Sequence, residues 1–176
     1  MKKIPVDTGI DDAVALVLAL QAKELDIKGI TTVAGNQTIE KTTRNTLDVV
    51  EYFGRSDIPV AMGAKGPLVR EQIIAAYAHG ESGLGTAVLP MAKIQPHELD
   101  AVGFIRKTLE ESEEQITLVP TGPLTNIAIL LKAYPHLKSK IKESGEEKGE
   151  EMLALLENGI KGFDEKELEA VVEFLS

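Results

Sequence analysis

Short apolar runs alternate with helical patterns along the first 142 residues of the chain. β-Branched and other apolar residues predict strands at residues 4–6, 27–34, 58–61 and 115–119. Apolar residues at helical spacing, among good helix formers, predict helices at residues 12–22, 39–53, 98–111 and 123–133. Strands that alternate with helices in this way predict an α/β fold, in which helices flank a Rossmann-like, mainly parallel sheet.

Local signals mark two helix starts and one long irregular segment. Thr38 is of a type preferred at the N-cap and directly precedes the helix predicted at residues 39–53. Pro123 suits the first turn of the helix predicted from that residue onward, because the ring fixes a helical φ. Residues 62–96 form a long segment punctuated by glycine, and such a segment in a compact domain is usually functional or poorly ordered.

The C-terminal residues differ from the rest of the chain in charge. The formal net charge is −9, and −8 of it belongs to residues 143–176, which hold eleven acidic residues and three lysines. Residues 143–150 are predicted to be an acidic linker, and residues 151–176 an amphipathic helical tail with helices at 151–157 and 164–175. The expected organisation is an α/β domain over residues 1–142 with a short helical C-terminal appendage.

Composition excludes several classes of protein. The absence of cysteine excludes a disulfide framework, a thiolate metal site and a cysteine nucleophile. The longest apolar run, residues 13–20, is too short to span a bilayer, and a carboxylate at residue 7 interrupts any signal peptide, so we expect a soluble, cytoplasmic protein. Without a basic stripe, and with three tyrosines, four phenylalanines and no tryptophan, neither nucleic acid nor a membrane is an expected partner.

Three carboxylates lie within six residues directly after the first predicted strand, in the sequence Asp-Thr-Gly-Ile-Asp-Asp at residues 7–12. A helix N-terminus offsets part of their mutual repulsion, and a hard cation such as Ca²⁺, which prefers oxygen ligands, would offset more. The alternative is ordinary capping, with Asp11 or Asp12 at the start of the helix and Asp7 solvated. From the residues alone, both interpretations stay open.

Three more polar segments follow predicted strands or lie in the long segment: residues 33–38, 79–85 and 119–126. Ligands of open α/β sheets bind beyond the carboxyl ends of the strands, so these segments can converge with the aspartates. Each also has an ordinary explanation: turn chemistry at Gly35–Asn36, a surface loop at His79, and helix initiation at residues 121–123. Templates for a serine nucleophile elbow and for glycine-rich phosphate loops do not match, and His97 and His136 are predicted to be surface residues without partners.

Taken together and in order, six motifs resemble the inosine–uridine-preferring nucleoside hydrolase family. The resemblance runs from about Lys3 to Lys142. Its motifs are Asp-x-Gly-Ile-Asp-Asp-Ala, Ile-Thr-Thr-Val-Ala-Gly-Asn, Lys-Thr-Thr-Arg-Asn at 41–45, Pro-Leu-Val-Arg, His-Gly-Glu-Ser-Gly and Leu-Val-Pro-Thr-Gly-Pro-Leu-Thr-Asn. One such motif is weak evidence, whereas six in sequence are specific.

The resemblance implies a Ca²⁺ site at the bottom of an active site. Asp7 looks like the ligand that also orients and deprotonates the attacking water. Asp12 looks like the bidentate ligand, and Thr121 like the residue that contributes its backbone carbonyl. Calcium at such a site would hold the ribose hydroxyls and acidify water, and a neighbouring carboxylate would serve as general base.

The same resemblance implies the contacts to a nucleoside. Asp11 resembles the carboxylate that hydrogen-bonds a ribose hydroxyl, with Asn36 close by, and His79 matches a catalytic-site histidine on the nucleobase side. The expected function is cleavage of the N-glycosidic bond of ribonucleosides to ribose and free base, with Ca²⁺ as cofactor. Neither the choice between purine and pyrimidine nucleosides nor the existence of a homo-oligomer follows from the sequence.

The chain also departs from the family pattern. Pro5 stands where the family has its first aspartate and Thr8 where it has proline; an alignment with Asp7 as that first aspartate is the alternative. The resemblance covers about the N-terminal half of a family member, so a fourth carboxylate ligand and the proposed acid are missing, and activity is expected to be impaired. The alternatives are a non-catalytic remnant that binds calcium or ribose, and a protein–protein module built on the tail helices.

Overall fold

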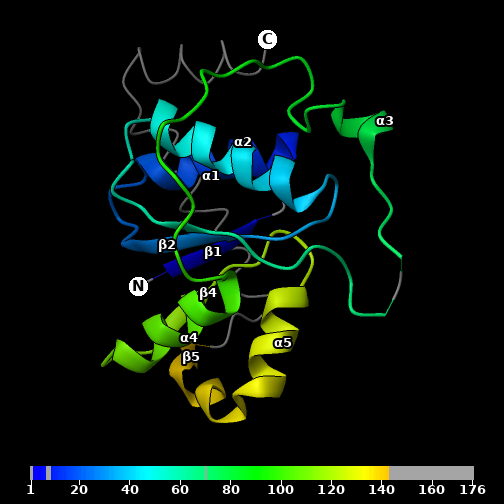
Figure 1. The fold of residues 1–176 in the computed structure, drawn as a ribbon. Coiled ribbons are helices and arrows are strands. Elements are labelled where there is room, and N and C mark those ends of the chain that lie inside the picture. The colour runs from blue at the N-terminus through cyan, green and yellow to red at the C-terminus, as the bar shows by residue number, and fades with distance from the viewer. Residues whose placement is uncertain (1, 7–8, 70, 143–176) are drawn as a thin grey trace.

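Five strands form one parallel sheet in the order β3-β2-β1-β4-β5 in the computed structural model, which describes residues 2–6, 9–69 and 71–142 (Figure 1). The strands are β1 Lys2–Val6, β2 Ile27–Thr32, β3 Val60–Ala61, β4 Ile116–Leu118 and β5 Ile141–Lys142. Each pair of neighbours is parallel. The prediction of a mainly parallel α/β sheet is confirmed.

The strand order reverses next to β1. From β1 the chain moves outward to β2 and β3, and it then returns to add β4 and β5 on the opposite side. Val6 is aligned with Thr32 of β2, and Lys3 is aligned with Leu118 of β4. The carboxyl ends of β1 and β4 therefore flank the position at which the strand order reverses, where ligands bind in folds of this kind.

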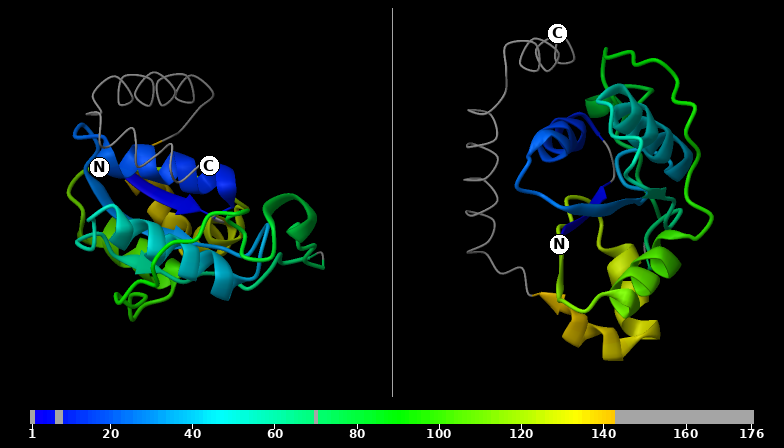
Figure 2. Two further views of the ribbon diagram at one scale, coloured as in Figure 1. Left: turned by 90° about the horizontal axis from the view of Figure 1, so that it is seen from above. Right: turned by 90° about the vertical axis from the view of Figure 1, so that its left-hand side faces the viewer.

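Helices cover both faces of the sheet (Figure 2). Helices α1 Ile10–Gln21 and α2 Ile39–Tyr52 pack together on one face, and α4 Ala101–Glu111 and α5 Thr125–Ala133 on the other. A short helix, α3 Ala76–His79, lies in the long segment between β3 and α4, and a 3₁₀ helix, η1 Pro135–Lys140, precedes β5. None of the helices in the described ranges is long and apolar enough to cross a membrane.

Two apolar cores lie on opposite faces of the sheet. The core beneath α1 and α2 includes Leu16, Val17, Ile30, Val50 and Val60. The core beneath α4 and α5 consists of Ile105, Leu109, Ile116, Leu118, Leu130 and Leu137. Complete burial of one such aliphatic side chain stabilises a fold by about 1.5–3 kcal/mol, so these residues hold the layers together.

The helix starts differ from their predicted positions for local reasons. Helix α1 begins at Ile10 with Gly9 as its N-cap. Asp11 and Asp12 lie in its first turn, at the helix start that the alternative interpretation expected, but neither is the N-cap residue. Helix α4 begins at Ala101, later than predicted, because the Asp100 carboxylate accepts a hydrogen bond from the backbone N–H of Gly103 at 2.7 Å. Thr38 is the N-cap of α2, as predicted, although its side chain makes no capping hydrogen bond.

Some elements were not predicted and some predictions lie outside the described ranges. Pattern analysis missed α3, η1 and β5, which have four, six and two residues and are too short for a periodic signal. Helix α5 begins at Thr125 and not at Pro123. The predicted linker and helical tail at residues 143–176 lie outside the described residues.

The prediction that His97 is a surface residue without partners was wrong. The imidazole of His97 is half-buried, and its ring centroid lies 4.8 Å from that of Phe104. Its Nδ1 accepts a hydrogen bond from the backbone N–H of Leu99 at 3.0 Å. Phe104 lies so close to β2 that a Cβ at Gly29 would be 2.5 Å from its ring. His136 is exposed, as predicted.

Candidate functional site

The end of β1 carries the predicted aspartates. Asp7 lies outside the described residues, whereas Asp11 and Asp12 both belong to the first turn of α1. Asp11 is exposed, but Asp12 is only 4% exposed. A carboxylate is buried where hydrogen bonds, a positive charge or a metal ion compensates the loss of hydration, and the positive end of the helix dipole contributes to this.

Strand β4 lies beside β1 and ends level with Lys3, three residues before the end of β1. Thr121 follows β4 after two residues and is exposed. Because β1 and β4 are adjacent and parallel, the segments that bear Asp12 and Thr121 leave the sheet at the same edge. The fold thus brings these two predicted metal ligands to one end of two neighbouring strands.

The donors at this edge are oxygen atoms, which suits a hard cation. A carboxylate at Asp12 and a backbone carbonyl at Thr121 are both ligand types that Ca²⁺ accepts. Within the described ranges, no group of three or more histidine and acidic side chains is arranged to hold a metal ion. The predicted ligand Asp7 does not belong to those ranges, so the complete predicted ligand set is not represented in them.

A buried asparagine joins α5 to the ends of two strands. The side-chain amide of Asn126 donates from Nδ2 to the carbonyl of Thr32 at 2.8 Å, and its Oδ1 accepts from the N–H of Ala64 at 2.9 Å. A Cβ at Gly63 would lie 2.2 Å from the Thr32 oxygen and 2.4 Å from Asn126 Nδ2. We call this arrangement, formed by Asn126, Thr32, Ala64 and Gly63, the Asn126 clamp. It fixes the edge of the sheet from which the candidate site residues emerge.

Asn36 and His79 belong to two segments that a backbone hydrogen bond joins. Asn36 is half-buried in the turn before α2, and its carbonyl accepts a hydrogen bond from the N–H of Ala75 at 2.9 Å. His79 is the last residue of α3, four residues further along the chain from Ala75. The turn that bears Asn36 and the short helix that bears His79 are therefore in contact, although they are far apart in the sequence.

The first part of the segment after His79 is bound to the beginning of α2. We call residues 80–94 the return segment. The side chain of Gln37 donates to the carbonyls of Gly80 and Glu81 at 3.0 and 3.2 Å, and Asn45 donates to the carbonyl of Ser82 at 2.9 Å. Lys41 also donates to the Glu81 carbonyl. Three side chains of α2 and its preceding turn thus bind three consecutive backbone carbonyls.

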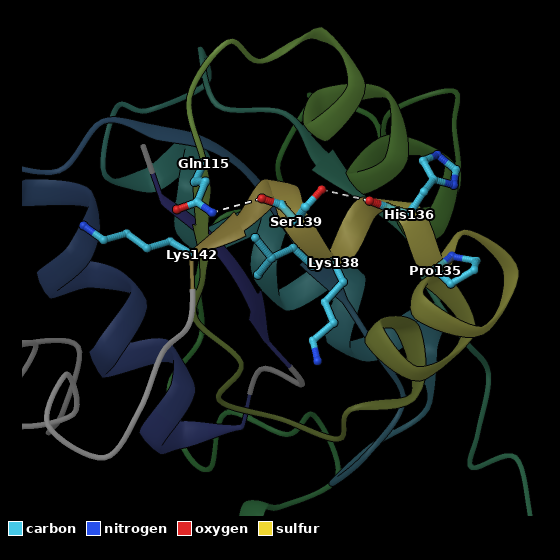
Figure 3. A pocket seen from close by; sticks show the side chains of 7 residues that line it. Gln115, Pro135, His136, Lys138, Ser139 and Lys142 are labelled. Atoms are coloured by element: carbon cyan, nitrogen blue, oxygen red, sulfur yellow. Dashed lines mark hydrogen bonds between the residues drawn. The ribbon is translucent and has the colours of Figure 1, made fainter.

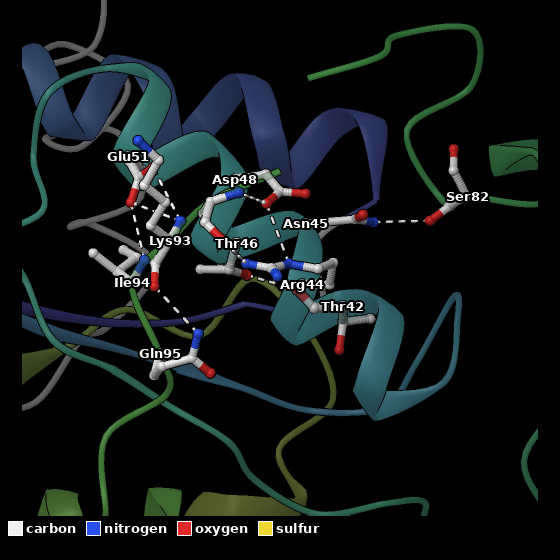
Figure 4. Close-up of polar contacts among 11 residues, drawn as sticks. Thr42, Arg44, Asn45, Thr46, Asp48, Glu51, Ser82, Lys93, Ile94 and Gln95 are labelled. Carbon is white, nitrogen blue, oxygen red and sulfur yellow. Dashed lines mark hydrogen bonds and ion pairs between the residues drawn. The ribbon is translucent and has the colours of Figure 1, made fainter. Parts of the chain in front are cut away.

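The second part of the return segment is bound further along α2 (Figure 4). Ala92 donates its N–H to Asp48 at 2.7 Å and accepts from Arg44 at 3.2 Å. The Glu51 carboxylate accepts from the N–H groups of Lys93 and Ile94 at 3.0 Å. The Lys93 N–H, and then that of Ile94, hold the pKa of Glu51 below its usual value. Leu84 and Ala92, each 6% exposed, add the return segment to the core beneath α1 and α2.

The motif Lys-Thr-Thr-Arg-Asn at residues 41–45 has a role that sequence reasoning did not identify. Its threonines face the sheet: Thr42 donates to the Val33 carbonyl at 3.2 Å, and the Thr43 and Thr32 hydroxyls lie 2.7 Å apart. The remaining members of the motif, Lys41, Arg44 and Asn45, bind the return segment. The motif therefore fixes α2 on one side and the segment after His79 on the other.

A cavity of about 700 Å³ lies away from the candidate site residues (Figure 3). Its lining residues are Gln115, Pro135, His136, Lys138, Ser139, Ile141 and Lys142. Gln115 directly precedes β4, so this cavity lies at the amino end of that strand and away from the edge that bears Asp12 and Thr121. The cavity contains none of the predicted site residues.

Comparisons with known proteins agree with the sequence resemblance. A model of the inosine-uridine preferring nucleoside hydrolase family matches residues 4–144. A pyrimidine-specific ribonucleoside hydrolase, RihA, of Escherichia coli O1:K1 is 55% identical over 135 residues, which are 77% of this chain and 43% of that protein. The chain thus spans less than half the length of this curated relative.

Solved structures of hydrolases share the fold. A purine-preferring ribonucleoside hydrolase from Gardnerella vaginalis superposes with a TM-score of 0.75 at 31% identity, over 80% of this chain and 46% of that one. The plant nucleoside hydrolase PpNRh1 also has a TM-score of 0.75, at 36% identity, over 80% of this chain and 45% of its own. The similarity is therefore one of sequence and of fold, over about half of each relative.

Proposed function

The chain belongs to the inosine-uridine preferring nucleoside hydrolase family, and from this membership we propose that it acts in the hydrolysis of ribonucleosides to ribose and free base. The structural observation that supports the proposal is the burial of Asp12, which is 4% exposed at the edge where the strand order reverses. Such an edge is where open α/β sheets bind their ligands.

The proposed roles follow the predicted residues. Asp12 and the carbonyl of Thr121, together with Asp7, would hold a Ca²⁺ ion. Bound there, Ca²⁺ would supply Lewis-acid chemistry and a fixed point for the ribose hydroxyls. The Asp7 carboxylate would take the proton of the attacking water, and a well-placed general base contributes about 10²–10⁴-fold to a rate.

The remaining residues would bind the nucleoside. The exposed carboxylate of Asp11 would accept a hydrogen bond from a ribose hydroxyl, and the half-buried Asn36 would lie beside it. His79, at the end of α3, would face the nucleobase. We propose pyrimidine ribonucleosides as the first substrates to test, because the pyrimidine-specific relative is 55% identical and the purine-preferring one 31%.

Calcium titration by calorimetry tests the metal site. We expect the chain to bind Ca²⁺, Asp12→Asn to weaken binding at least tenfold, and Asp11→Asn to keep Ca²⁺ affinity but weaken binding of uridine. Asp26→Asn is the matched control, because Asp26 is exposed beyond α1 and pairs with Lys28 at 2.6 Å. Equal Ca²⁺ affinity of Asp12→Asn and Asp26→Asn would contradict the assignment.

Turnover separates an enzyme from a binding protein. The alternative function is that of a calcium- or ribose-binding protein without catalysis. We expect slow release of uracil from uridine, abolished by a chelator and by Asp7→Asn. Binding of Ca²⁺ and uridine without any release of base would instead support the second function.

A further inference from the structure

Gln37 is an unusual residue in the contact between α2 and the return segment. Its side chain is 1% exposed, and its Nε2 donates to two backbone carbonyls, those of Gly80 and Glu81. Its Oε1 is buried without a hydrogen-bond partner among the residues that the structure describes. Its own backbone carbonyl accepts from Gln72 at 3.0 Å, so the residue is bound to the long segment from two sides.

The buried side chain of Gln37 combines two hydrogen bonds with one acceptor that has no partner among the described residues. A buried acceptor without a partner destabilises a fold, whereas an apolar side chain of similar shape avoids that cost. Methionine has nearly the size of glutamine and would fill the same space. What methionine cannot do is donate hydrogen bonds to the carbonyls of Gly80 and Glu81.

The backbone that Gln37 binds has a specific shape. Gly80, Gly83 and Gly85 have φ values of +73°, +91° and +62°, the left-handed region that favours glycine. A Cβ at Gly83 would lie 3.1 Å from Gln37 Cγ and 3.0 Å from Asn45 Nδ2, so the loop rests directly on these two side chains. The residue that precedes this bound loop is His79.

We propose that Gln37 is a positioning residue that holds the backbone of residues 80–83 against α2 and thereby fixes the place of His79 for substrate. The inference rests on the proposed function, in which His79 faces the nucleobase. Gln37 contacts the loop and not the substrate, and its effect is transmitted through the backbone bonds at Gly80 and Glu81.

Gln37→Met, with Gln95→Met as matched control, tests this in the free protein. Gln95 is exposed and, within the part of the chain that the structure describes, donates only to the carbonyl of Lys93, two residues away. The protein has three histidines, so their imidazole signals are separable by NMR. We expect Gln37→Met to shift or broaden the His79 signal alone, to speed amide exchange at Gly83 at least tenfold, and to leave the melting temperature within a few degrees.

A second measurement adds the substrate. In Gln37→Met we expect weaker binding of uridine, or a raised KM with kcat little changed, at unchanged Ca²⁺ affinity, whereas Gln95→Met matches the wild type in both. Because the loop measurements need no nucleoside, a wild type that fails to bind uridine would refute the proposed function and still leave the positioning of the loop decided by NMR.

Two results would overturn the inference. An unchanged His79 signal together with unchanged exchange at Gly83 would show that Gln37 does not hold the loop. Equal disturbance of all three histidines with a large fall in melting temperature would show a general structural role. Should Gln37→Met fail to fold, Asn45→Ala removes the neighbouring bond to the Ser82 carbonyl and must give the same selective change at His79.

Discussion

The Asn126 clamp and the contacts that Asp48 and Glu51 make with the return segment differ in burial. In both, side chains bind backbone groups: Asn126 joins the last residue of β2 to Ala64 beyond β3, whereas Asp48 and Glu51 bind residues 92–94. Asn126 is 1% exposed, and each end of its amide has a partner. Asp48, which accepts from the Ala92 N–H, is half-buried, and the bond between Lys93 and Glu51 is exposed. Gln37, which binds the first part of the return segment, is as buried as Asn126.

Burial decides whether loss of such a hydrogen bond destabilises the whole domain or disorders one segment. A buried backbone group that loses its partner cannot turn to water, whereas an exposed one is rehydrated. The Asn126 clamp should therefore contribute to the stability of the whole domain, and the contacts of Asp48 and Glu51 chiefly to the order of residues 92–94. Mutations in the two regions should consequently have different readouts.

Loss of the Asn126 clamp should have the largest effect. Asn126→Ala removes the amide that binds the Thr32 carbonyl and the Ala64 N–H, at about 1–3 kcal/mol for the buried carbonyl and less for the part-buried N–H. We expect the free energy of unfolding to fall by about 3 kcal/mol in urea denaturation. Gln115→Ala is the control, since Gln115 is exposed and makes one bond, to Ser139. If both variants lose the same amount, the clamp is not a stabilising feature.

Alanine variants of Gly54 and Gly83 distinguish the effect of backbone strain from that of contact with α2. Gly54 and Gly83 have φ values of +69° and +91°, but a Cβ at Gly54 has no atom within 4 Å, whereas one at Gly83 presses on Gln37 and Asn45. We expect each alanine variant to lower stability by about 1–2 kcal/mol. Only Gly83→Ala should speed amide exchange across residues 80–84; equal exchange in the two variants would contradict contact with α2.

Asp48→Ala should lower the free energy of unfolding less than Asn126→Ala does, and more than the loss of a surface ion pair. Asp48→Ala removes the acceptor of the Ala92 N–H and the partner of Arg44 at 3.2 Å, and we expect a loss of about 1 kcal/mol. Glu110→Ala, which breaks an exposed pair with Arg106 at 3.7 Å, should be close to neutral. Thermal denaturation of both variants measures the difference, and a larger loss in Glu110→Ala would refute the ranking.

The smallest expected effect is the loss of the Glu51 contacts when the pH is lowered. The pKa of Glu51 is lowered by the N–H groups of Lys93 and Ile94, so its contribution is present at neutral pH and is lost as the pH falls below the usual glutamate value of about 4.3. We expect the amide NMR signals of Lys93 and Ile94 to titrate with a midpoint below that value. In Glu51→Gln this titration should be absent; its persistence would assign it to another group.

Much of the fold could be predicted from the local pattern of apolar and polar residues in the sequence. The four main predicted strands and the four main helices are present because apolar periodicity and propensity act within a few residues. Thr38 shows the limit: it stands at the N-cap as predicted, yet its hydroxyl makes no cap bond there. The short elements α3, η1 and β5 were not predicted, because they have too few residues for a periodic pattern.

The candidate site was predictable only in part. Asp11 and Asp12 follow β1, and Thr121 follows β4, and the carboxyl ends of parallel strands lie at the same end of a sheet. Their roles at a site stay predictions. The burial of Asp12, which its neighbour Asp11 does not share, could not be predicted, because both lie in the first turn of α1 and the packing of the helix decides which one points inward.

The sequence by itself determined the kinds of elements, their order and the family, because these depend on local propensity and on motifs along the chain. The tertiary structure decided which distant groups meet. Asn126 binds the carbonyl of Thr32 across 94 residues, and Gln37 binds that of Gly80 across 43. No local pattern encodes such bonds, because they form only after the sheet and helices have packed and the entropy of closing long loops has been overcome.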